Sequence, residues 1–384
     1  MNKNIGIYIH IPFCSSKCYY CDFASYPDKN QYISDYIDSL CNEILNSSDI
    51  LCEYNITSIY IGGGTPSYID SNYIAKILNL LSMFRKEDNI PITIEVNPNS
   101  VTYEKVKMYK ELGINRISVG LQSTHDDILK SIGRKHTYKD FLNALKVIKE
   151  TGIEDVSLDL IYPLPGLNYK LLDETLETVA SLKNEYNIHH ISIYNLEVHE
   201  GTKLDFLLKE GFYSLIDEDE EYNMKENIIN KLESNGFNRY EISNYSIEGY
   251  ESVHNINYWK QGMYLGFGVA ASSFFAGSRY TNTRKIEDYI KYYLEEDRSI
   301  PIIAEQDDLT KLDLMKEYVI LNLRLQQGVS KQDFYIKFKV KLTDIFDKEI
   351  NKMRNNGLLH ESKTNVYLTN RGKDVANIVW EEFI

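Results

Sequence analysis

The chain has 384 residues, of which 43% are hydrophobic and 26% are charged, a balance typical of a globular protein with a substantial core. Its formal net charge of −14, from 42 basic and 56 acidic residues, argues against binding to a phosphate backbone, so nucleic acid is not an expected partner. The apolar runs are no longer than a strand, and no signal or transit peptide precedes the first of them, so we expect no membrane span. The five cysteines, three of them clustered, suit a reducing compartment, and we predict a cytoplasmic protein.

Short β-rich runs alternate with amphipathic helical stretches over the first half of the chain. The predicted strands are 5–11, 56–61, 92–96, 116–121, 156–161 and 190–196, and the predicted helices between them are 32–46, 73–84, 103–112, 138–151 and 171–184. Strands that alternate with helices form βαβ units and a parallel sheet. The pattern therefore predicts an α/β fold, an open partial barrel of six β/α units.

Polar or glycine-rich residues follow the predicted strands, at the end where a parallel barrel gathers its chemistry. The first strand leads to three cysteines and the second to Gly62-Gly63-Gly64-Thr65-Pro66, while the later strand ends carry Glu95, Gln122, Asp159 and Glu197. These residue types are therefore predicted to share one rim of the barrel.

The second half of the chain does not show the same alternation of strands and helices. A helix over 218–235 is followed by a segment, 239–280, that is rich in aromatic and small residues and is predicted to be irregular. Further on we predict helices over 311–326, 331–337 and 343–355, strands over 359–361 and 366–368, and a final helix from Arg371. This order is similar to a winged-helix domain, but residues 344–354 balance acids with bases, which argues against DNA recognition.

We accordingly predict three parts. Residues 1–238 form the barrel with its trailing helices, 239–300 an aromatic-rich connecting segment, and 301–384 a small winged-helix-like α+β domain.

The cysteine run Cys14-Ser-Ser-Lys-Cys18-Tyr-Tyr-Cys21 supplies three thiolates from one short loop. Zinc sites usually pair a Cys-x2-Cys hook with a second pair or with two histidines downstream, and neither follows here. A [4Fe–4S] cluster held by only three cysteines leaves one iron free for an outside ligand. A ferredoxin-like or zinc-holding loop is the alternative interpretation.

Cys-x3-Cys-x2-Cys directly after a strand resembles the radical S-adenosylmethionine (SAM) proteins. The resemblance implies a [4Fe–4S] cluster on Cys14, Cys18 and Cys21, with SAM chelated at the open iron. It implies the partial (β/α)6 radical SAM barrel as the fold. It also implies that one electron from the reduced cluster breaks a C–S bond of SAM and releases a 5′-deoxyadenosyl radical.

The same resemblance assigns the strand-end residues to SAM. Gly63, Gly64 and Thr65 match the site for the SAM amino group, where the absence of side chains admits a ligand. Glu95, Gln122, Arg134 and Asp159 fall where the family contacts SAM, and an arginine can pair with its carboxylate. Tyr20 is expected to place its ring against adenine, and Tyr8 to line the same site. The alternative interpretations are solvated surface charges and, for Tyr20, packing in the core.

Several longer segments narrow the match to the group that contains oxygen-independent coproporphyrinogen III dehydrogenase (HemN) and the HemW family of heme chaperones. They are Tyr8-Ile-His10-Ile-Pro12-Phe13-Cys14, Arg116-Ile-Ser-Val-Gly120-Leu-Gln122-Ser123, Asp159-Leu-Ile-Tyr162-Pro-Leu-Pro165-Gly166, Tyr240-Glu241-Ile-Ser-Asn244-Tyr245 and His254-Asn255-Ile-Asn-Tyr258-Trp259. The dehydrogenase pattern has a fourth cysteine where this chain has Phe23, and an N-terminal extension that this chain lacks. Both features, together with His-Asn-x-x-Tyr-Trp, favour the HemW family.

The resemblance also implies that the protein binds heme, and His254 is the candidate ligand to the heme iron. A neutral imidazole is an ordinary axial ligand, and Tyr258, Trp259 and Tyr264 offer flat surface for a macrocycle. The alternative is a hydrogen-bonded structural histidine. His10 could instead hydrogen-bond near the cluster or the substrate.

The predicted function is therefore that of a radical SAM heme chaperone of the HemW type, which binds a [4Fe–4S] cluster, SAM and heme and transfers heme to respiratory haemoproteins. The enzyme alternative is coproporphyrinogen III dehydrogenase, which decarboxylates two propionates oxidatively. A heme-cleaving radical SAM methyltransferase and a non-catalytic electron-transfer protein are further alternatives. Expected partners are haemoprotein acceptors and an electron donor such as a flavodoxin or ferredoxin. Transient contact with a membrane or a respiratory complex, a homodimer, and cleavage of SAM stay open.

Overall fold

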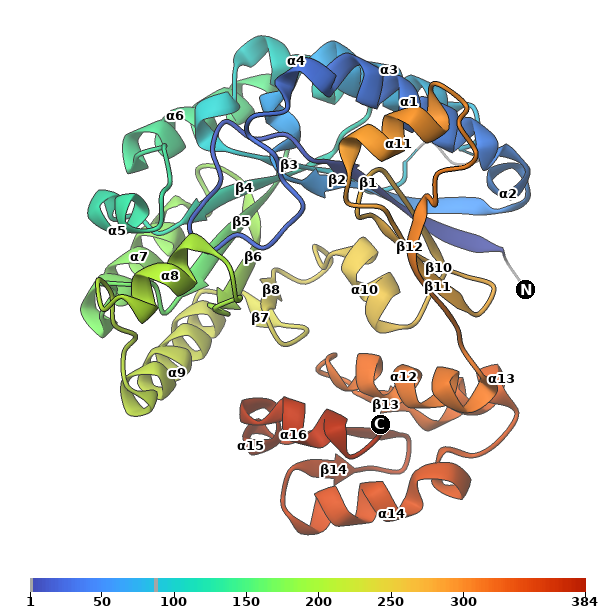
Figure 1. The fold of residues 1–384 in the computed structure, drawn as a ribbon. Helices are drawn as coiled ribbons and strands as arrows, with labels where there is room; N and C mark the ends of the chain where they lie inside the picture. Colours follow the sequence, from blue (N-terminus) through green and yellow to red (C-terminus); the bar gives the residue numbers. More distant parts are fainter. Residues whose placement is uncertain (1–2, 86–88) are drawn as a thin grey trace.

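The computed structural model describes residues 3–85 and 89–384, and its first half is the expected open barrel (Figure 1). Six parallel strands pair in chain order, namely β1 (Asn4–Ile11), β2 (Asn55–Gly63), β3 (Ile92–Val96), β4 (Arg116–Gln122), β5 (Asp155–Tyr162) and β6 (Ile188–Asn195). The helices α1 (Ile33–Asn46), α3 (Ser71–Ser82), α4 (Tyr103–Glu111), α6 (Tyr138–Thr151) and α7 (Tyr169–Leu182) cover the outer face. The partial (β/α)6 barrel predicted from the sequence is thus confirmed.

The barrel strands have one apolar face and one polar face, and this difference explains why the sheet folds as it does. Ile5, Ile7, Ile9 and Ile11 of β1 are all fully buried in the main core, and the equivalent positions of the other strands are also apolar. The alternate positions lie on the other face of the sheet because side chains in a strand point to opposite sides in turn. Apart from Ile161 near the end of β5, those positions are polar or glycine, and they include Tyr8, His10, Ser58, Tyr60, Thr93, Glu95, Ser118, Asp159 and Ser192. The inside of the barrel is consequently a polar surface on which a ligand can be held.

Helix starts follow the local sequence. Thr137 begins α6 with a reciprocal capping box in which its side chain and that of Asp140 bond each other's backbone, and Gly152 ends the helix in the left-handed region at φ 76°. Short helices that the sequence did not indicate are α2 (Ser48–Glu53), α5 (Asp126–Ser131) and α8 (Lys203–Lys209), and α9 (Glu218–Ser234) matches the predicted trailing helix.

The segment 239–280 is regular, so the prediction of an irregular segment was wrong. It contains β8 (Asn244–Ser246), α10 (Val253–Trp259), β9 (Tyr264–Phe267), β10 (Ser272–Phe275) and β11 (Ser278–Asn282), while β7 (Asn238–Arg239) precedes it and α11 (Ile286–Tyr293) and β12 (Ile303–Asp308) follow. β9 pairs in parallel with β1, and β8 pairs with β6. The barrel sheet is therefore extended by further strands beyond β1 and beyond β6. These strands are too short to show an alternating pattern in the sequence. They form strands because they pair with strands of the barrel.

The C-terminal part has a hydrophobic core of its own, separate from that of the barrel. It comprises α12 (Lys311–Leu323), β13 (Val329–Ser330), α13 (Lys331–Phe338), α14 (Leu342–Asn355), β14 (Leu359–Glu361), β15 (Asn365–Leu368), α15 (Asn370–Asp374) and α16 (Ala376–Glu381). The expected helices and hairpin are present, and the final helix is broken in two at Val375. The aromatic segment packs into the barrel core, and the three predicted boundaries stay a prediction.

Arg324 joins the two cores. Its guanidinium lies 4.4 Å from the ring centroid of Trp259 on α10 and 4.9 Å from that of Trp380 on α16. Nearby, the backbone of Leu325 pairs with that of Glu241. The end of α12 is therefore fixed to the aromatic segment by cation–π contacts as well as by backbone pairing.

Candidate cluster and cofactor site

The three cysteines lie on the loop between β1 and α1, which crosses the barrel mouth (Figure 1). Backbone hydrogen bonds tie this loop to distant elements: Tyr19 N donates to Ile132 O at 3.0 Å, and Leu204 N at the start of α8 donates to Tyr19 O at 2.8 Å. Gly133 faces the ring of Tyr19 so closely that a Cβ would come within 2.6 Å of it. The loop is thus positioned by the segments that follow β4 and β6 as well as by β1.

All three cysteines are free thiols, and each sulfur has a polar neighbour. Thr65 Oγ1 lies 3.5 Å from Cys14 Sγ, Arg134 Nη1 lies 3.6 Å from Cys18 Sγ, and Ser25 Oγ lies 3.8 Å from Cys21 Sγ. Burial raises the pKa of Cys14 and of Cys21, so these thiols keep their protons until a metal displaces them.

The three cysteine side chains do not form a site for a single metal ion. Across residues 3–85 and 89–384, no three histidine, cysteine, aspartate or glutamate side chains converge where a single metal ion would sit. A cubane spreads its irons over separate corners, so its thiolates need not converge. The donor set, three free thiols on one loop, fits a [4Fe–4S] cluster better than a mononuclear zinc ion.

Gly63 and Gly64 bring the end of β2 against the cysteine loop. A Cβ on Gly64 would lie 2.9 Å from Cys14 Sγ and 2.9 Å from Phe13 O, and Thr65 N donates to Phe13 O at 2.9 Å. Gly63 has φ 112°, in the region that favours glycine, and faces the ring of His10. Only glycine allows the end of β2 to approach the cysteine loop this closely, and the binding of the SAM amino group by these glycines stays a prediction.

Two predicted SAM residues, Glu95 and Asp159, are carboxyl groups on the inner face of the barrel. Glu95 accepts from Tyr60 Oη at 2.9 Å and from Gly63 N at 3.2 Å. Ser118, opposite Glu95 in the sheet, donates to both oxygens of Asp159 at 3.1 Å. Burial, and then the charge of Asp159, raises the pKa of Glu95 to about 7, while burial raises that of Asp159 to about 6. Both carboxyl groups would gain from a cationic ligand.

The side chains of Arg134 and Gln122 both lie next to the backbone of Gly120, in the space that a Cβ at position 120 would occupy. Arg134 Nη2 donates to Gly120 O at 2.7 Å, and a Cβ on Gly120 would lie 3.0 Å from Arg134 Nη2 and from Gln122 Nε2. Arg134 Nε and Gln122 Oε1 are buried without a hydrogen-bond partner. Gln122 also has φ 62°, a strained value for a residue with a side chain. A free donor and a free acceptor beside the cysteine loop fit a polar ligand such as SAM.

Tyr8 and Tyr20 are both engaged in contacts within the protein. Tyr8 Oη lies 3.0 Å from His10 Nδ1, and His10 Nε2 lies 2.8 Å from Ala24 O, so Tyr8 and His10 together brace the loop beyond Cys21. Burial lowers the pKa of His10 to about 4, which keeps the ring neutral. Tyr20 packs partly against the main core. Their roles toward SAM stay predictions.

Sequence reasoning did not assign Tyr60 or Ser118 to the site, and named His10 without assigning it. All three lie on the polar inner face, at alternate positions of strands that are otherwise apolar. That alternation is the signal that could have found them.

The aromatic segment lies next to this site. His254 of α10 is 3% exposed, and its ring stacks on Tyr60 with the centroids 5.3 Å apart. Ser58 Oγ lies 2.9 Å from Nδ1 and Tyr258 Oη lies 2.7 Å from Nε2 of His254. Burial lowers the pKa of His254 to about 3. These contacts favour the structural alternative for His254, and iron ligation by it stays a prediction.

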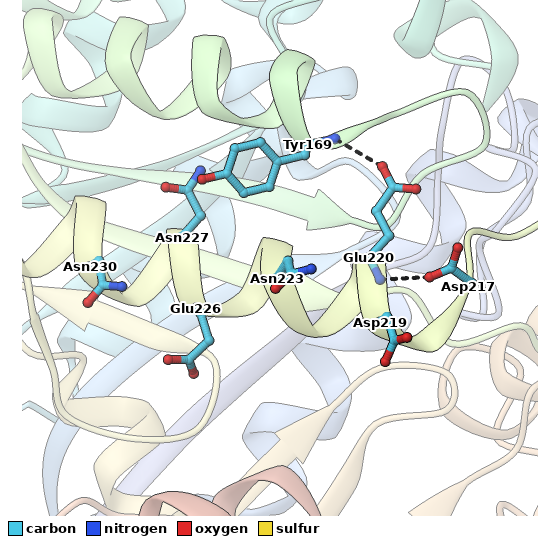
Figure 2. A pocket seen from close by; sticks show the side chains of 8 residues that line it. All are labelled: Tyr169, Asp217, Asp219, Glu220, Asn223, Glu226, Asn227 and Asn230. Carbon is cyan, nitrogen blue, oxygen red and sulfur yellow. Dashed lines mark hydrogen bonds between the residues drawn. The ribbon is translucent and has the colours of Figure 1, made fainter.

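A second hollow lies outside the barrel. It has a volume of about 660 Å³. Figure 2 shows Tyr169 at the start of α7 and, from α9 and its N-cap, the acidic and amide side chains Asp217, Asp219, Glu220, Asn223, Glu226, Asn227 and Asn230. None of the predicted site residues lines it, so it is separate from the cysteine loop.

The polar barrel and the three-cysteine loop define the class of protein. Residues 8–179 match the family model described as the radical SAM superfamily, and residues 309–375 match the HemN C-terminal domain. The structure of coproporphyrinogen III oxidase (HemN) from Escherichia coli superposes with a TM-score of 0.85 at 21% identity, covering 100% of this chain and 90% of that one. The fold is therefore the radical SAM fold. When bound, a [4Fe–4S] cluster and SAM supply radical chemistry to proteins of this class.

The relatives identify the family within that class. The chain is 35% identical over 379 residues to the heme chaperone HemW of Bacillus subtilis, covering 98% of each chain. It is 34% identical over 385 residues to that of Lactococcus lactis, covering 100% of this chain and 98% of that one. This chain belongs to the HemW family.

Among the residues that the structure describes, no helix combines the length and the apolar character needed to cross a bilayer.

Proposed function

We propose that this protein is a radical SAM heme chaperone, which holds a [4Fe–4S] cluster on Cys14, Cys18 and Cys21, binds SAM at the barrel mouth, and transfers heme to respiratory haemoproteins. The observation that carries the proposal is the likeness to heme chaperones along the whole chain, 35% identical over 98% of it. An electron carrier such as a flavodoxin or ferredoxin would reduce the cluster.

The arrangement of the strands supports a link between cluster and cargo. β1, which leads into the cysteine loop, pairs on one side with β2 and on the other with β9, whose first residue is Tyr264. The aromatic segment therefore adjoins β1, the strand that leads into the loop of the cluster ligands. Within that segment His254 stacks on Tyr60, whose hydroxyl donates to Glu95, so heme bound against α10 would lie near the proposed SAM site.

The dehydrogenase alternative draws support from the fold, which it shares. Against it stands Phe23, which occupies the position of the dehydrogenase's fourth cysteine and is 69% exposed. A phenyl group cannot replace a thiol in acid–base or metal chemistry. We therefore place decarboxylation of coproporphyrinogen second.

One experiment separates the two functions. Anaerobically reconstituted protein is incubated with SAM, a reductant and coproporphyrinogen III, and the porphyrinogens are followed by mass spectrometry. In parallel, heme-loaded protein is mixed with an apo-cytochrome, and holo-cytochrome formation is followed by its absorbance. We expect that no decarboxylated product forms. We also expect heme transfer that depends on SAM or on the cluster, and the Cys14→Ala protein is the control. Decarboxylated product would overturn the chaperone proposal in favour of the dehydrogenase, and heme that stays on the protein would contradict the transfer step.

A further inference from the structure

The C-terminal part of the chain is attached to the aromatic segment by polar contacts. Glu317 of α12 lies at their centre: its Oε1 accepts from Arg279 Nη2 at 2.7 Å and its Oε2 accepts from Gln261 Nε2 at 2.8 Å. Gln261 Nε2 also donates to Leu314 O at 3.0 Å, and Lys337 Nζ donates to Gln261 O at 2.9 Å. We call Gln261, Arg279 and Glu317 the latch. It joins the end of α10 and strand β11 to helix α12.

The interface that the latch closes is not a shared core. The C-terminal part and the barrel have separate hydrophobic cores, although Ile242 of the aromatic segment is partly buried against the C-terminal one. Within the described part of the chain, the covalent connection between the two parts is the pair Leu309 and Thr310, between β12 and α12. Relative motion is the ordinary expectation across polar interfaces inside one chain. A connection this short can act as a hinge, because few residues need to change their backbone angles.

Buried polar atoms on both sides of this interface lack a partner while the two parts are together. They are Trp259 Nε1, Gln261 Oε1, Glu241 Oε2, Arg324 Nε and Trp380 Nε1. Each atom gives up its hydrogen bonds with water and receives none in return, which penalises the closed arrangement. Gln261 adds backbone strain, since its φ of 51° lies in the left-handed region that disfavours a side chain. Separation of the two parts would return these polar atoms to water and so offset the loss of the latch.

The closed interface covers the aromatic face of α10. It encloses a cavity of about 190 Å³, whose wall includes Tyr258 and Trp259 of α10 on one side and Leu321 of α12 on the other. Pockets that enclose a whole small ligand have roughly 300–1,000 Å³. A macrocycle therefore does not fit between α10 and α12 while the latch is closed.

We propose that the C-terminal part is a lid, which opens about Leu309 and Thr310 when the latch breaks and thereby uncovers α10 for heme. The inference rests on the proposed function, because it assumes that heme is held against α10. The arrangement in Figure 1 is then the closed form, and the open form is the one that binds. The apparent heme affinity is the affinity of the open form reduced by the fraction of molecules that are open. The latch therefore weakens heme binding, and its closure favours release of heme to an acceptor.

The test compares Glu317→Gln with the wild type. Glutamine keeps the size of the side chain and can still accept from Gln261, but it removes the ion pair with Arg279. Titration of the full-length protein with ferric heme should show binding about two- to fivefold tighter than in the wild type, with faster association. Glu361→Gln is the matched control, because it removes an ion pair with Lys331 that lies entirely within the C-terminal part. Its heme affinity should equal that of the wild type.

Hydrogen exchange of the heme-free protein, followed by mass spectrometry, measures the lid without any ligand. Gln326 N donates to Tyr240 O at 2.9 Å across the interface, so the peptide that contains Gln326 reports separation of the two parts. Its exchange should be faster in Glu317→Gln than in the wild type or in Glu361→Gln, and added heme should speed it in the wild type.

Two results would overturn the inference. One is exchange of that peptide at the same rate in all three heme-free proteins, and the other is heme binding that is no tighter in Glu317→Gln than in Glu361→Gln. A wild type that binds no heme would refute the proposed function instead, while the exchange of the heme-free proteins would still decide whether the lid opens.

Discussion

The ring of Tyr60 stacks on the imidazole of His254, with their centroids 5.3 Å apart and their planes inclined by 24°, while its hydroxyl donates to Glu95 at 2.9 Å. One side chain of β2 thus touches both a carboxyl group predicted to bind SAM and the helix predicted to meet heme. The two sites are one residue apart, so a ligand at one can alter the affinity of the other, and any such coupling must be reciprocal.

Tyr60→Phe should weaken SAM binding and spare heme. The substitution removes a hydrogen bond to a buried carboxyl group, which is worth about 1.5–3 kcal/mol, or roughly a tenfold to hundredfold loss of affinity. Phenylalanine keeps the stack on His254, so the heme affinity should stay within about twofold. Calorimetric titration of reconstituted protein measures both. Tyr60→Leu, which also loses the stack, should weaken both ligands, and an unchanged SAM affinity in Tyr60→Phe would exclude Glu95 as a direct SAM contact.

Alanine at position 14, 18 or 21 should prevent cluster assembly, because three cysteines are the minimum that this loop supplies. Iron and sulfide analysis after anaerobic reconstitution, with electron paramagnetic resonance of the reduced protein, measures the loss. Cys52→Ala is the matched control, since this thiol is exposed and remote from the loop in sequence. A full cluster in any of the three loop variants would remove that cysteine from the ligand set.

The affinity for SAM should rise with pH between about pH 5.5 and 7.5. Burial raises the pKa of Glu95 to about 7, so this carboxyl group is mostly protonated at the lower end of that range. A cationic amino group binds the ionised form, so each pH unit below the pKa should cost up to about tenfold in affinity. Glu95→Gln should bind weakly and lose the rise near pH 7, which leaves the contribution of Asp159, whose pKa burial raises to about 6. A wild-type affinity that is constant over this range would contradict the assignment.

Glu43 on α1 should make stability depend on pH. It accepts hydrogen bonds from Gly268 N at 2.7 Å, Tyr289 Oη at 2.5 Å, Asn282 Nδ2 at 2.6 Å and Tyr293 Oη at 3.2 Å, and burial raises its pKa to about 7. Its folded pKa lies above the unfolded value of 4.5, so its stabilising contribution is complete below about pH 4.5 and is lost as the pH rises through about 7.

Glu43→Gln should be less stable by about 1–3 kcal/mol at pH 5, because the amide would direct an N–H at the donor Asn282 Nδ2. The deficit should shrink toward pH 8, where the wild type has lost the contribution of the protonated carboxyl group. Urea unfolding of both proteins from pH 5 to 8 gives the difference directly. A deficit that grows with pH would mean that Glu43 is ionised in the folded protein.

Arg324→Ala should loosen the C-terminal part from the aromatic segment. The two cation–π contacts that it removes are worth about 0.5–2 kcal/mol each. The chain has only two tryptophans, and both stack on this guanidinium, so their fluorescence reports the change without a label. We expect a shifted emission and a lower melting temperature. Arg324→Lys keeps the charge without the planar stack and should show most of the effect, whereas wild-type emission in both variants would show that the contact does not form in solution.

The sequence was sufficient to predict the barrel because its signals are local and repeated. β3 and α6 have the predicted bounds, and the other barrel strands differ by one to two residues at an end. The cysteine loop and Gly63 and Gly64 could be placed because their spacing carries the chemistry. The polar alternation along the strands was also visible, yet Tyr60 and Ser118 were not assigned from it.

Other features depend on contacts between distant residues. β9 follows from pairing with β1, about 260 residues earlier in the chain, which a run of four residues cannot indicate. Likewise, His254 was suggested as a ligand from its neighbours in sequence, whereas its nitrogens are occupied by Ser58, almost 200 positions away, and by Tyr258. Occupancy of a donor atom is a property of the fold.

The extension of the sheet has a consequence for self-association. Because β9 and β8 cover β1 and β6, the unpaired edges of the sheet are moved to β7, which has two residues, and to β12. β12 carries Glu305, Asp307 and Asp308, all exposed. A short edge and an acidic edge both resist strand-to-strand pairing with another molecule. The protein therefore keeps an open barrel without exposing an edge that would seed aggregation.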